Sequence, residues 1–273
     1  MDQYAVFGNP IAHSKSPFIH KMFAEQTGQS LHYAAILSPL DGFAESVSTF
    51  IASGGRGANV TVPFKEQAFK LVEQLSPAAR QAGSVNTLIY QDGKLLGDNT
   101  DGIGLVKDLL FNGVGLKDKA VLILGAGGAT RGVVLPILKQ QPGMLHIANR
   151  TAAKAEELAR HFCQFGPVTG SGLEAIPPMA FDVVINASSS SLSGESPDIA
   201  SSYIANQPVC YDMVYGKEIT AFNNWCAAQG AGLTLDGLGM LVEQAAQSFY
   251  LWRGIMPDTQ PVRQALRMSL SQA

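Results

Sequence analysis

Short clusters of polar residues recur in the N-terminal part of the chain, at positions where an ordinary surface loop would not need them. They are Ser14-Lys15-Ser16-Pro17, Asn59-Val60-Thr61, Lys65, Asn86-Thr87 and Asp98-Asn99-Thr100-Asp101. Asn59 and Thr61 share one face of an extended segment, because side chains alternate along a strand. The turn that follows brings Lys65 beside them. One ammonium group among hydroxyls, amides and carboxylates indicates a site for a small polar molecule.

A glycine-rich turn follows an apolar run in LILGAGGATRG (122–132). Its glycines stand after an expected strand and before an expected helix, which lets backbone N–H groups approach a pyrophosphate at the helix N-terminus. The match to G-x-G-x-x-G is imperfect, because Thr130 stands at the third position. A plain glycine-rich turn is the alternative. The predicted dinucleotide-binding residues are Gly125, Ala126, Gly127, Gly128 and Ala129.

The end of the next expected strand carries basic rather than acidic residues. It reads Asn149-Arg150-Thr151, with Lys154 one turn later. A site for NAD usually presents an acid here to the ribose hydroxyls. A guanidinium instead pairs well with a 2′-phosphate, because it offers a planar fork of donors. These four residues therefore predict NADP as the cofactor, the alternative being ordinary charges at a solvated helix end.

Short β-type runs alternate with helical patterns from end to end, which predicts parallel βαβ units and an α/β fold. The later strands are almost continuously apolar and suit a sheet that is covered on both faces. Residues 84–97 instead predict an antiparallel pair around an Asp92-Gly93 turn. The expected parallel strands are 4–8, 31–37, 57–62, 119–125, 144–150, 181–187 and 208–215.

Helices are expected where caps, prolines and glycines punctuate the apolar pattern. Ser16 is a candidate cap for a helix that stops at Gly28, and Pro63 begins a second helix. A third helix runs to Gly113 and is expected to cross between domains. The segment 237–273 supplies the last two helices.

Length and composition limit the remaining possibilities. The 273 residues, 46% of them hydrophobic, predict two domains with a cleft between them. The net charge of −3 is spread along the chain, which argues against nucleic acid and membrane partners. Three dispersed cysteines indicate neither a disulfide framework nor a metal site. Because the first residues, MDQYAVFGNP, show no leader pattern, we expect a cytoplasmic protein.

The chain resembles the shikimate dehydrogenase family along essentially its whole length. No single motif decides this, but the joint match in the family's order is highly specific. The matching segments are GNPIAHSKSP (8–17), GANVTVPFKE (57–66), AGSVNT (82–87), GDNTDG (97–102), GAGGATRG (125–132), NRT (149–151), YDMVY (211–215) and DGLGMLVEQAA (236–246).

The resemblance implies an enzyme that reversibly reduces 3-dehydroshikimate to shikimate with NADPH, in the pathway to chorismate and the aromatic amino acids. Lys65 and Asp101 would be the catalytic pair. An ammonium group can stabilise the negative charge that develops on a ketone oxygen during hydride transfer and then deliver the proton. Asp101 would hold Lys65 in place.

The resemblance also implies the binding residues and the domain roles. Ser14 and Ser16 would bind the substrate carboxylate, with Tyr215 near it, and the ring hydroxyls would be bound by Asn59, Thr61, Asn86 and Gln244. Further cofactor candidates are Met213, Gly237 and Met240, although the methionines would equally fill a core. The substrate-binding and catalytic domain would comprise 1–101 with 237–273, and the Rossmann-like NADP-binding domain 102–236. A monomer or a homodimer is expected.

Several alternatives stay open. One is a quinate/shikimate dehydrogenase that also accepts NAD, and another is a non-catalytic sensor of shikimate-like ligands. Taken singly, each polar residue also has a plain structural interpretation as a cap, a solvated charge or a core side chain. His13 is interpreted as structural, because Lys65 already fills the acid–base role. Ser191 stands where the family has a glycine, beside the expected nicotinamide ribose.

Overall fold

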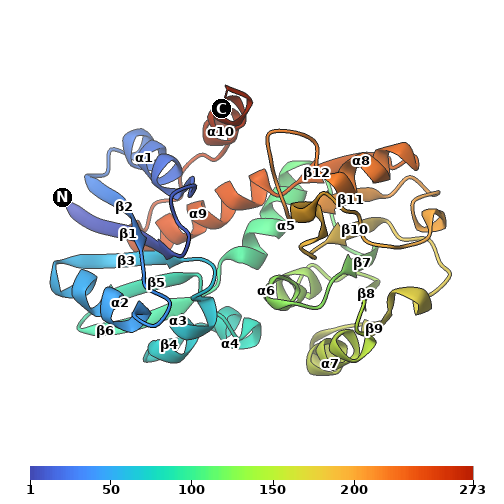
Figure 1. The fold of residues 1–273 in the computed structure, drawn as a ribbon, viewed down its shortest axis with the longest axis horizontal. Coiled ribbons are helices and arrows are strands. Elements are labelled where there is room, and N and C mark those ends of the chain that lie inside the picture. The colour runs from blue at the N-terminus through green and yellow to red at the C-terminus, as the bar shows by residue number, and fades with distance from the viewer. Residues whose placement is uncertain (273) are drawn as a thin grey trace. The chain divides into compact units, whose positions relative to one another are not determined.

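The computed structural model describes residues 1–272, except for the side chain of Leu192, and divides into two compact units. The first unit consists of Met1–Gly104 with Leu241–Met268. The second consists of Leu105–Met240, with the residues from Ser269 onward. Each unit contains one six-stranded sheet with helices packed on it (Figure 1). Within the described residues, no helix combines the length and apolarity that crossing a membrane requires.

The sheet of the first unit has the strand order β2-β1-β3-β5-β6-β4. β1 pairs in parallel with β2 and β3, whereas β5 and β6 form the predicted antiparallel hairpin. Asp92 and Gly93 both have positive φ, 51° and 75°, as a two-residue type I′ turn requires. The strands are β1 Asp2–Gly8, β2 Leu31–Leu37, β3 Gly55–Val60, β4 Gln74–Leu75, β5 Thr87–Gln91 and β6 Lys94–Asp98.

Both faces of this sheet are buried. Successive residues of β1 point to opposite faces, and those from Tyr4 to Gly8 are all buried. Ala5 and Phe7 of β1 join a core with Phe43 of α2 and Phe64 before α3. Tyr4 and Val6 point to the other face. The helices of this unit are α1 Ser16–Thr27, α2 Phe43–Ala52, α3 Lys65–Leu71 and α4 Pro77–Ala82, with most of α9 Leu238–Arg253 and of α10 Gln260–Gln272.

Two helix starts differ from the sequence prediction. Ser16 is the first residue of α1 rather than its cap, and its N–H donates to Ser14 Oγ at 3.3 Å. α3 begins at Lys65, because the chain first closes a turn in which Phe64 N–H donates to the carbonyl oxygen of Thr61. Pro63 therefore lies in the turn before the helix.

The second sheet is wholly parallel, with the strand order β12-β11-β10-β7-β8-β9. Its central strands were predicted, but the two edge strands β9 and β12 were not. Edge strands lack a continuous apolar run, because one side of each faces solvent. The strands are β7 Ala120–Leu124, β8 Met144–Asn149, β9 Val168–Gly172, β10 Val183–Asn186, β11 Val209–Asp212 and β12 Leu233–Asp236.

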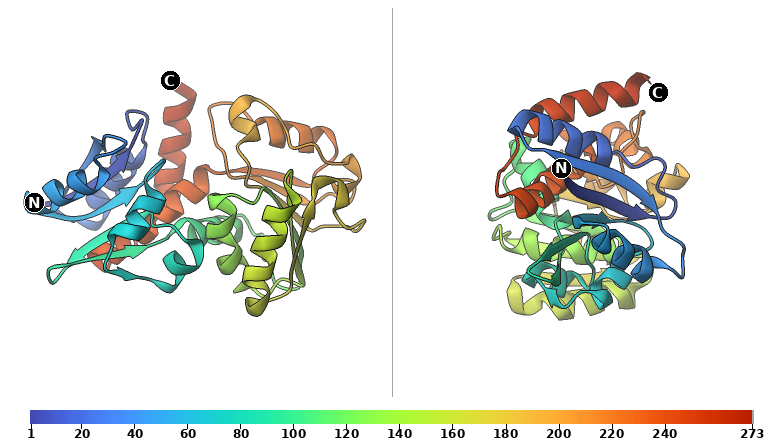
Figure 2. Two further views of the ribbon diagram at one scale, coloured as in Figure 1. Left: turned by 60° about the horizontal axis from the view of Figure 1, so that its bottom comes forward. Right: turned by 90° about the vertical axis from the view of Figure 1, so that its left-hand side faces the viewer.

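Helices cover both faces of the second sheet, and the predicted α/β class is confirmed. Val121 and Ile123 of β7 pack into one core with α5, α6 and α7, whereas Leu122 and Leu124 pack into another with α8. Figure 2 shows α7, in yellow-green, along one face of this sheet. The helices are α5 Asp101–Phe111, α6 Gly128–Leu138, α7 Ala152–Phe162 and α8 Ala221–Ala228, with 3₁₀ turns η1 Cys163–Phe165, η2 Leu173–Ala175, η3 Ser190–Ser193 and η4 Ser201–Tyr203.

Candidate active site and cofactor site

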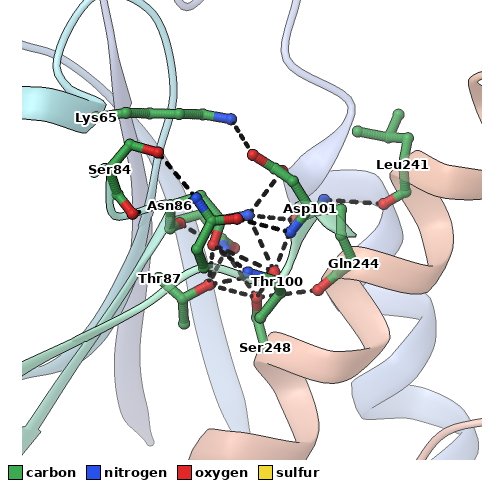
Figure 3. Close-up of polar contacts among 11 residues, drawn as sticks. Lys65, Ser84, Asn86, Thr87, Thr100, Asp101, Leu241, Gln244 and Ser248 are labelled. Carbon is green, nitrogen blue, oxygen red and sulfur yellow. Dashed lines mark hydrogen bonds and ion pairs between the residues drawn. The ribbon is translucent and has the colours of Figure 1, made fainter. Parts of the chain in front are cut away.

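An ion pair joins the first residues of two helices in the first unit. The Nζ atom of Lys65, at the start of α3, lies 2.5 Å from Oδ2 of Asp101, at the start of α5 (Figure 3). The Asp101 N–H donates to Asn99 Oδ1 at 3.1 Å, which fixes the beginning of α5. The side chain of Lys65 is 31% exposed and that of Asp101 is 18% exposed, so a ligand can reach both.

Asn86 holds the other carboxylate oxygen of this pair. Its Nδ2 donates to Asp101 Oδ1 at 2.8 Å, while its Oδ1 accepts from the Thr100 N–H at 2.9 Å. One carboxylate oxygen of Asp101 therefore accepts from the Asn86 amide, and the other accepts from the Lys65 ammonium group. This orientation leaves Lys65 with its remaining protons available to a third group.

Gln244 reaches the same cluster from α9. Its Oε1 accepts from Asn86 Nδ2 and from Thr100 Oγ1, both at 3.4 Å. Its Nε2 donates to the carbonyl oxygen of Leu241 at 2.9 Å. The long contacts to Asn86 and Thr100 are weak hydrogen bonds.

Ser248 lies one turn further along α9 and was not identified from the sequence. It is fully buried, its Oγ lies 2.8 Å from Thr87 Oγ1, and it accepts from Asn59 Nδ2 at 2.9 Å. These contacts tie α9 to β3 and β5 beneath the ion pair (Figure 3). Its spacing four residues after Gln244 is the one available sequence signal, because positions i and i+4 share a helix face.

The structure places Asn59 deeper than the sequence interpretation implied. Its Oδ1 accepts from Tyr33 Oη at 2.7 Å and contacts His20 Nε2 at 3.2 Å, while its Nδ2 donates to Ser248 and to the carbonyl oxygen of Asn86. Protein groups thus occupy both ends of an amide that is only 6% exposed. This favours a positioning role for Asn59 over direct contact with a ligand.

Tyr33 and His20 support Asn59 and were also missed. Burial raises the pKa of the Tyr33 phenol well above its usual value, and a hydrogen bond with the Ser16 hydroxyl opposes that rise. Burial lowers the pKa of His20 to about 3, opposed by its hydrogen bond with Asn59. Both side chains are therefore neutral near pH 7. Their rings stack with centroids 4.3 Å apart.

Strand direction explains why these distant segments meet. β1 and β3 are parallel, so Ser14, Ser16 and Thr61 follow strands that end at one edge of the sheet. β5 runs the opposite way, so Asn86 precedes it at the same edge. β6 returns to that edge and leads into Asp101. Ser16 is 8% exposed, and Ser14 and Thr61 are half-buried.

The glycine-rich turn lies at the switch point of the second sheet. From β7 the chain continues to β8 and β9 on one side and then to β10, β11 and β12 on the other, and such a crevice binds dinucleotides. Gly125 has φ 111°, and a side-chain carbon there would lie 3.1 Å from the backbone of Ala187 and Ser188. Thr130 Oγ1 donates to the Gly125 carbonyl oxygen at 2.9 Å, so this departure from the motif closes the turn.

The turn and the end of β8 fit a phosphorylated dinucleotide. Space is open beside Gly127 and Gly128 at the N-terminus of α6, where N–H groups can meet a pyrophosphate. Arg150 and Lys154 are exposed after β8. Asn149 Nδ2 donates to the carbonyl oxygen of Thr151 at 2.9 Å, which shapes the entry to α7.

The remaining candidates lie on the loops that follow β11 and β12, except for Met240, which lies in the first turn of α9. The Gly237 N–H donates to the Val214 carbonyl oxygen at 3.1 Å, and a side chain at Gly237 would overlap the carbonyl oxygen of Met213. Met240 is 9% exposed and packs in the core of the second unit, which favours the core interpretation for this methionine. Tyr215 is half-buried, and burial followed by the charge of Asp236 raises its pKa.

The dinucleotide-binding fold and the lysine–aspartate pair define the class of nicotinamide-dependent oxidoreductases. Family models match most of the chain: the shikimate dehydrogenase substrate binding domain matches residues 6–88, shikimate / quinate 5-dehydrogenase matches 108–195, and the shikimate 5'-dehydrogenase C-terminal domain matches 237–267. The chain belongs to the shikimate dehydrogenase family, which confirms the resemblance seen in the sequence.

Individual relatives agree with this assignment. The chain is 54% identical to a shikimate dehydrogenase (NADP(+)) of Photobacterium profundum, over 100% of both chains. A crystal structure of an Ael1 enzyme from Pseudomonas putida is 43% identical, with a TM-score of 0.94 over 97% of this chain and 98% of that one. A shikimate 5-dehydrogenase from Thermus thermophilus, in complex with NADP(H) and shikimate, is 31% identical, with a TM-score of 0.88 over 99% of this chain and 100% of that one.

Proposed function

We propose that this protein catalyses the reversible, NADP-dependent reduction of 3-dehydroshikimate to shikimate. The observation that carries the proposal is the Lys65–Asp101 ion pair, held on its second carboxylate oxygen by Asn86. The pair is partly exposed, whereas the hydroxyl and amide cluster beneath it is buried. A charged pair that serves only stability needs no such cluster of orienting groups.

NADPH, when bound, supplies the hydride. As negative charge grows on the ketone oxygen, the Lys65 ammonium group stabilises it and transfers a proton to it. Asp101 keeps Nζ in place through Oδ2, while Asn86 fixes the carboxylate through Oδ1. In the reverse direction, a neutral Lys65 removes the proton from the shikimate hydroxyl.

Substrate binding is assigned to the first unit. The hydroxyls of Ser14 and Ser16 bind the carboxylate. The ring hydroxyls are bound by Thr61 and Gln244, which lie on or beside the same sheet edge. Asn86, whose amide is 3% exposed and is held at both ends, orients Asp101 instead. Asn59 acts indirectly, because its amide already holds Ser248 and the Asn86 backbone.

Cofactor binding is assigned to the second unit. The backbone of Gly125 to Ala129 binds the pyrophosphate, and Arg150 and Lys154 bind the 2′-phosphate, with Asn149 and Thr151 shaping that strand end. Met213 and Gly237 border the nicotinamide half. The protein acts in the cytoplasm as a monomer or a homodimer and has no nucleic acid partner.

The test is turnover with defined substrate and cofactor pairs. Purified protein is mixed with shikimate or quinate and with NADP⁺ or NAD⁺, and the appearance of reduced cofactor is followed by absorbance. We expect the highest specificity constant with shikimate and NADP⁺. A quinate/shikimate dehydrogenase with broader cofactor use would turn over the other pairs comparably. Absence of turnover with every pair, despite shikimate binding in calorimetry, would instead identify a sensor.

A further inference from the structure

The loop after β10 is fastened to the neighbouring strand by one serine. Ser191 Oγ donates to Asp212 Oδ2 at 2.5 Å, at the end of β11. The same oxygen accepts from the Phe222 N–H, in the first turn of α8, at 3.4 Å. Ser191 therefore joins the β10 loop to both β11 and α8.

The partner of Ser191 also organises the next loop. Asp212 is fully buried, and its Oδ1 accepts from the Val214 N–H and from Asn186 Nδ2, each at 3.1 Å. Burial raises the pKa of Asp212, and hydrogen bonds from Ser191 and Thr220 oppose that rise. One carboxylate thus fixes the end of β10, the loop that starts after β11, and the loop that carries Ser191.

The other serines of the β10 loop make shorter-range contacts. Ser188 Oγ donates to Asn186 Oδ1 at 2.6 Å and lies 2.8 Å from Ser190 Oγ. These bonds shape the loop but do not reach β11. Removal of the Ser191 hydroxyl would therefore leave the local shape supported while releasing the contact with Asp212.

The loop forms one wall of the switch-point crevice. β10 is the neighbour of β7, and the backbone of Ala187 and Ser188 packs against Gly125 of the glycine-rich turn. The basic end of β8 lies on the opposite side of β7. A dinucleotide whose pyrophosphate sits at the turn and whose 2′-phosphate meets Arg150 must direct its other half toward β10 and β11.

We propose that Ser191, acting through Asp212, is a positioning residue that holds the β10 and β11 loops in the arrangement that binds the nicotinamide half of NADP. The inference rests on the proposed function, because it assumes that NADP occupies this crevice. The Ser191 hydroxyl supplies an attachment that a glycine cannot make.

The test compares two ligands that share the adenine half. The Kd of NADPH is measured by fluorescence titration and that of adenosine 2′,5′-bisphosphate by calorimetry, for wild type and Ser191→Ala. We expect the NADPH Kd to rise about tenfold in the variant, because a hydrogen bond to a buried carboxylate is lost. The bisphosphate Kd should stay within about twofold, since that ligand has no nicotinamide half.

Two further variants separate positioning from general destabilisation. Ser191→Thr keeps the hydroxyl and should restore the NADPH Kd to within about threefold of wild type. Ser202→Ala removes an exposed hydroxyl from the same unit and should change neither Kd. An unchanged NADPH Kd in Ser191→Ala would overturn the inference, as would an equal rise for both ligands. A wild type that binds neither ligand would contradict the proposed function itself.

Discussion

Lys65 and Asp101, separated by 36 residues in the chain, face each other from the first residues of α3 and α5, and Asn86 binds the carboxylate oxygen that the lysine leaves open. The geometry places a proton donor at the rim of a buried polar cluster. Side chains from β3, β5 and α9 build that cluster beneath the pair.

Loss of both serine hydroxyls of the β1 loop should weaken shikimate binding. In Ser14→Ala/Ser16→Ala we expect the shikimate Kd to rise about a hundredfold or more, because each of the two hydroxyl bonds to a carboxylate contributes about 1.5 to 3 kcal/mol. α1 should persist, since its start loses only the long 3.3 Å bond from the Ser16 N–H to Ser14 Oγ. Calorimetric titration of a folded double variant gives the answer, and an unchanged affinity would place the carboxylate elsewhere.

Replacing Arg150 should change cofactor preference rather than turnover of NAD⁺. The Arg150→Ala variant loses a charge-assisted contact of about 1.5 to 3 kcal/mol, so the NADP⁺ Michaelis constant should rise about ten- to a hundredfold. The weak use of NAD⁺ should barely change, because NAD⁺ has no 2′-phosphate. The ratio of the two specificity constants is measured at low ionic strength.

A matched control for this experiment lies on α7, the helix that follows Arg150. Arg160→Ala removes an exposed guanidinium from the last turn of α7 and should leave the ratio unchanged. A wild type that prefers NAD⁺, or a ratio that Arg150→Ala does not move, would show that the end of β8 is not the 2′-phosphate site.

Removal of the Ser248 hydroxyl should destabilise the protein. In Ser248→Ala, Asn59 Nδ2 loses its 2.9 Å acceptor inside a fully buried cluster, so the free energy of unfolding should fall by about 1 to 3 kcal/mol. The shikimate Kd should rise less than in Ser14→Ala/Ser16→Ala, because Ser248 acts through Asn59 and Thr87. The free energy of unfolding is measured by urea denaturation. The control is Ser48→Ala, which removes an exposed hydroxyl from α2 and should match wild type. A Ser248→Ala protein as stable as wild type would contradict the prediction.

The lowered pKa of His20 predicts how the free energy of unfolding depends on pH. Its pKa is about 3 in the folded protein against an ordinary value of 6.5, so the unfolded chain takes up a proton first as the pH falls. The stabilising contribution of neutral His20 is complete above pH 6.5 and is lost as the pH drops toward 3. The free energy of unfolding should then fall by up to about 1.4 kcal/mol per pH unit from this group.

The His20 effect is measurable as a difference between variants. Between about pH 7 and pH 5, before most carboxylates titrate, His20→Phe should show a smaller slope than wild type. Burial also lowers the pKa of His146, which adds a slope of the same sign in both proteins. Equal slopes in wild type and His20→Phe would refute the assignment.

Local sequence signals predicted the features that depend on neighbouring residues. The Asp92-Gly93 turn, the glycine stop at Gly28 and the central strands all follow from propensity and periodicity. β9 and β12 were missed because edge strands are half-exposed and carry polar residues and glycine. Such strands give no clear apolar pattern.

The parts of the site that sequence did not reveal depend on contacts between distant segments. Ser248 meets Thr87 across 161 residues, because α9 returns to the first unit after the chain has built the second. Tyr33 and His20 look like ordinary core residues until their contacts with Asn59 are known. The sequence predicts Ser16 as a cap, but in the structure the Ser16 N–H donates to Ser14 Oγ and the Ser16 hydroxyl bonds to Tyr33.

The most direct test of the account is single-turnover NADPH formation from shikimate and NADP⁺ in wild type and Lys65→Ala, with shikimate affinity measured in parallel by calorimetry. Loss of the proton-transferring group should lower turnover by about two to four orders of magnitude while the shikimate Kd changes little. A Lys65→Ala protein that keeps more than about a tenth of wild-type turnover would contradict the account and assign proton transfer to another group, such as His13.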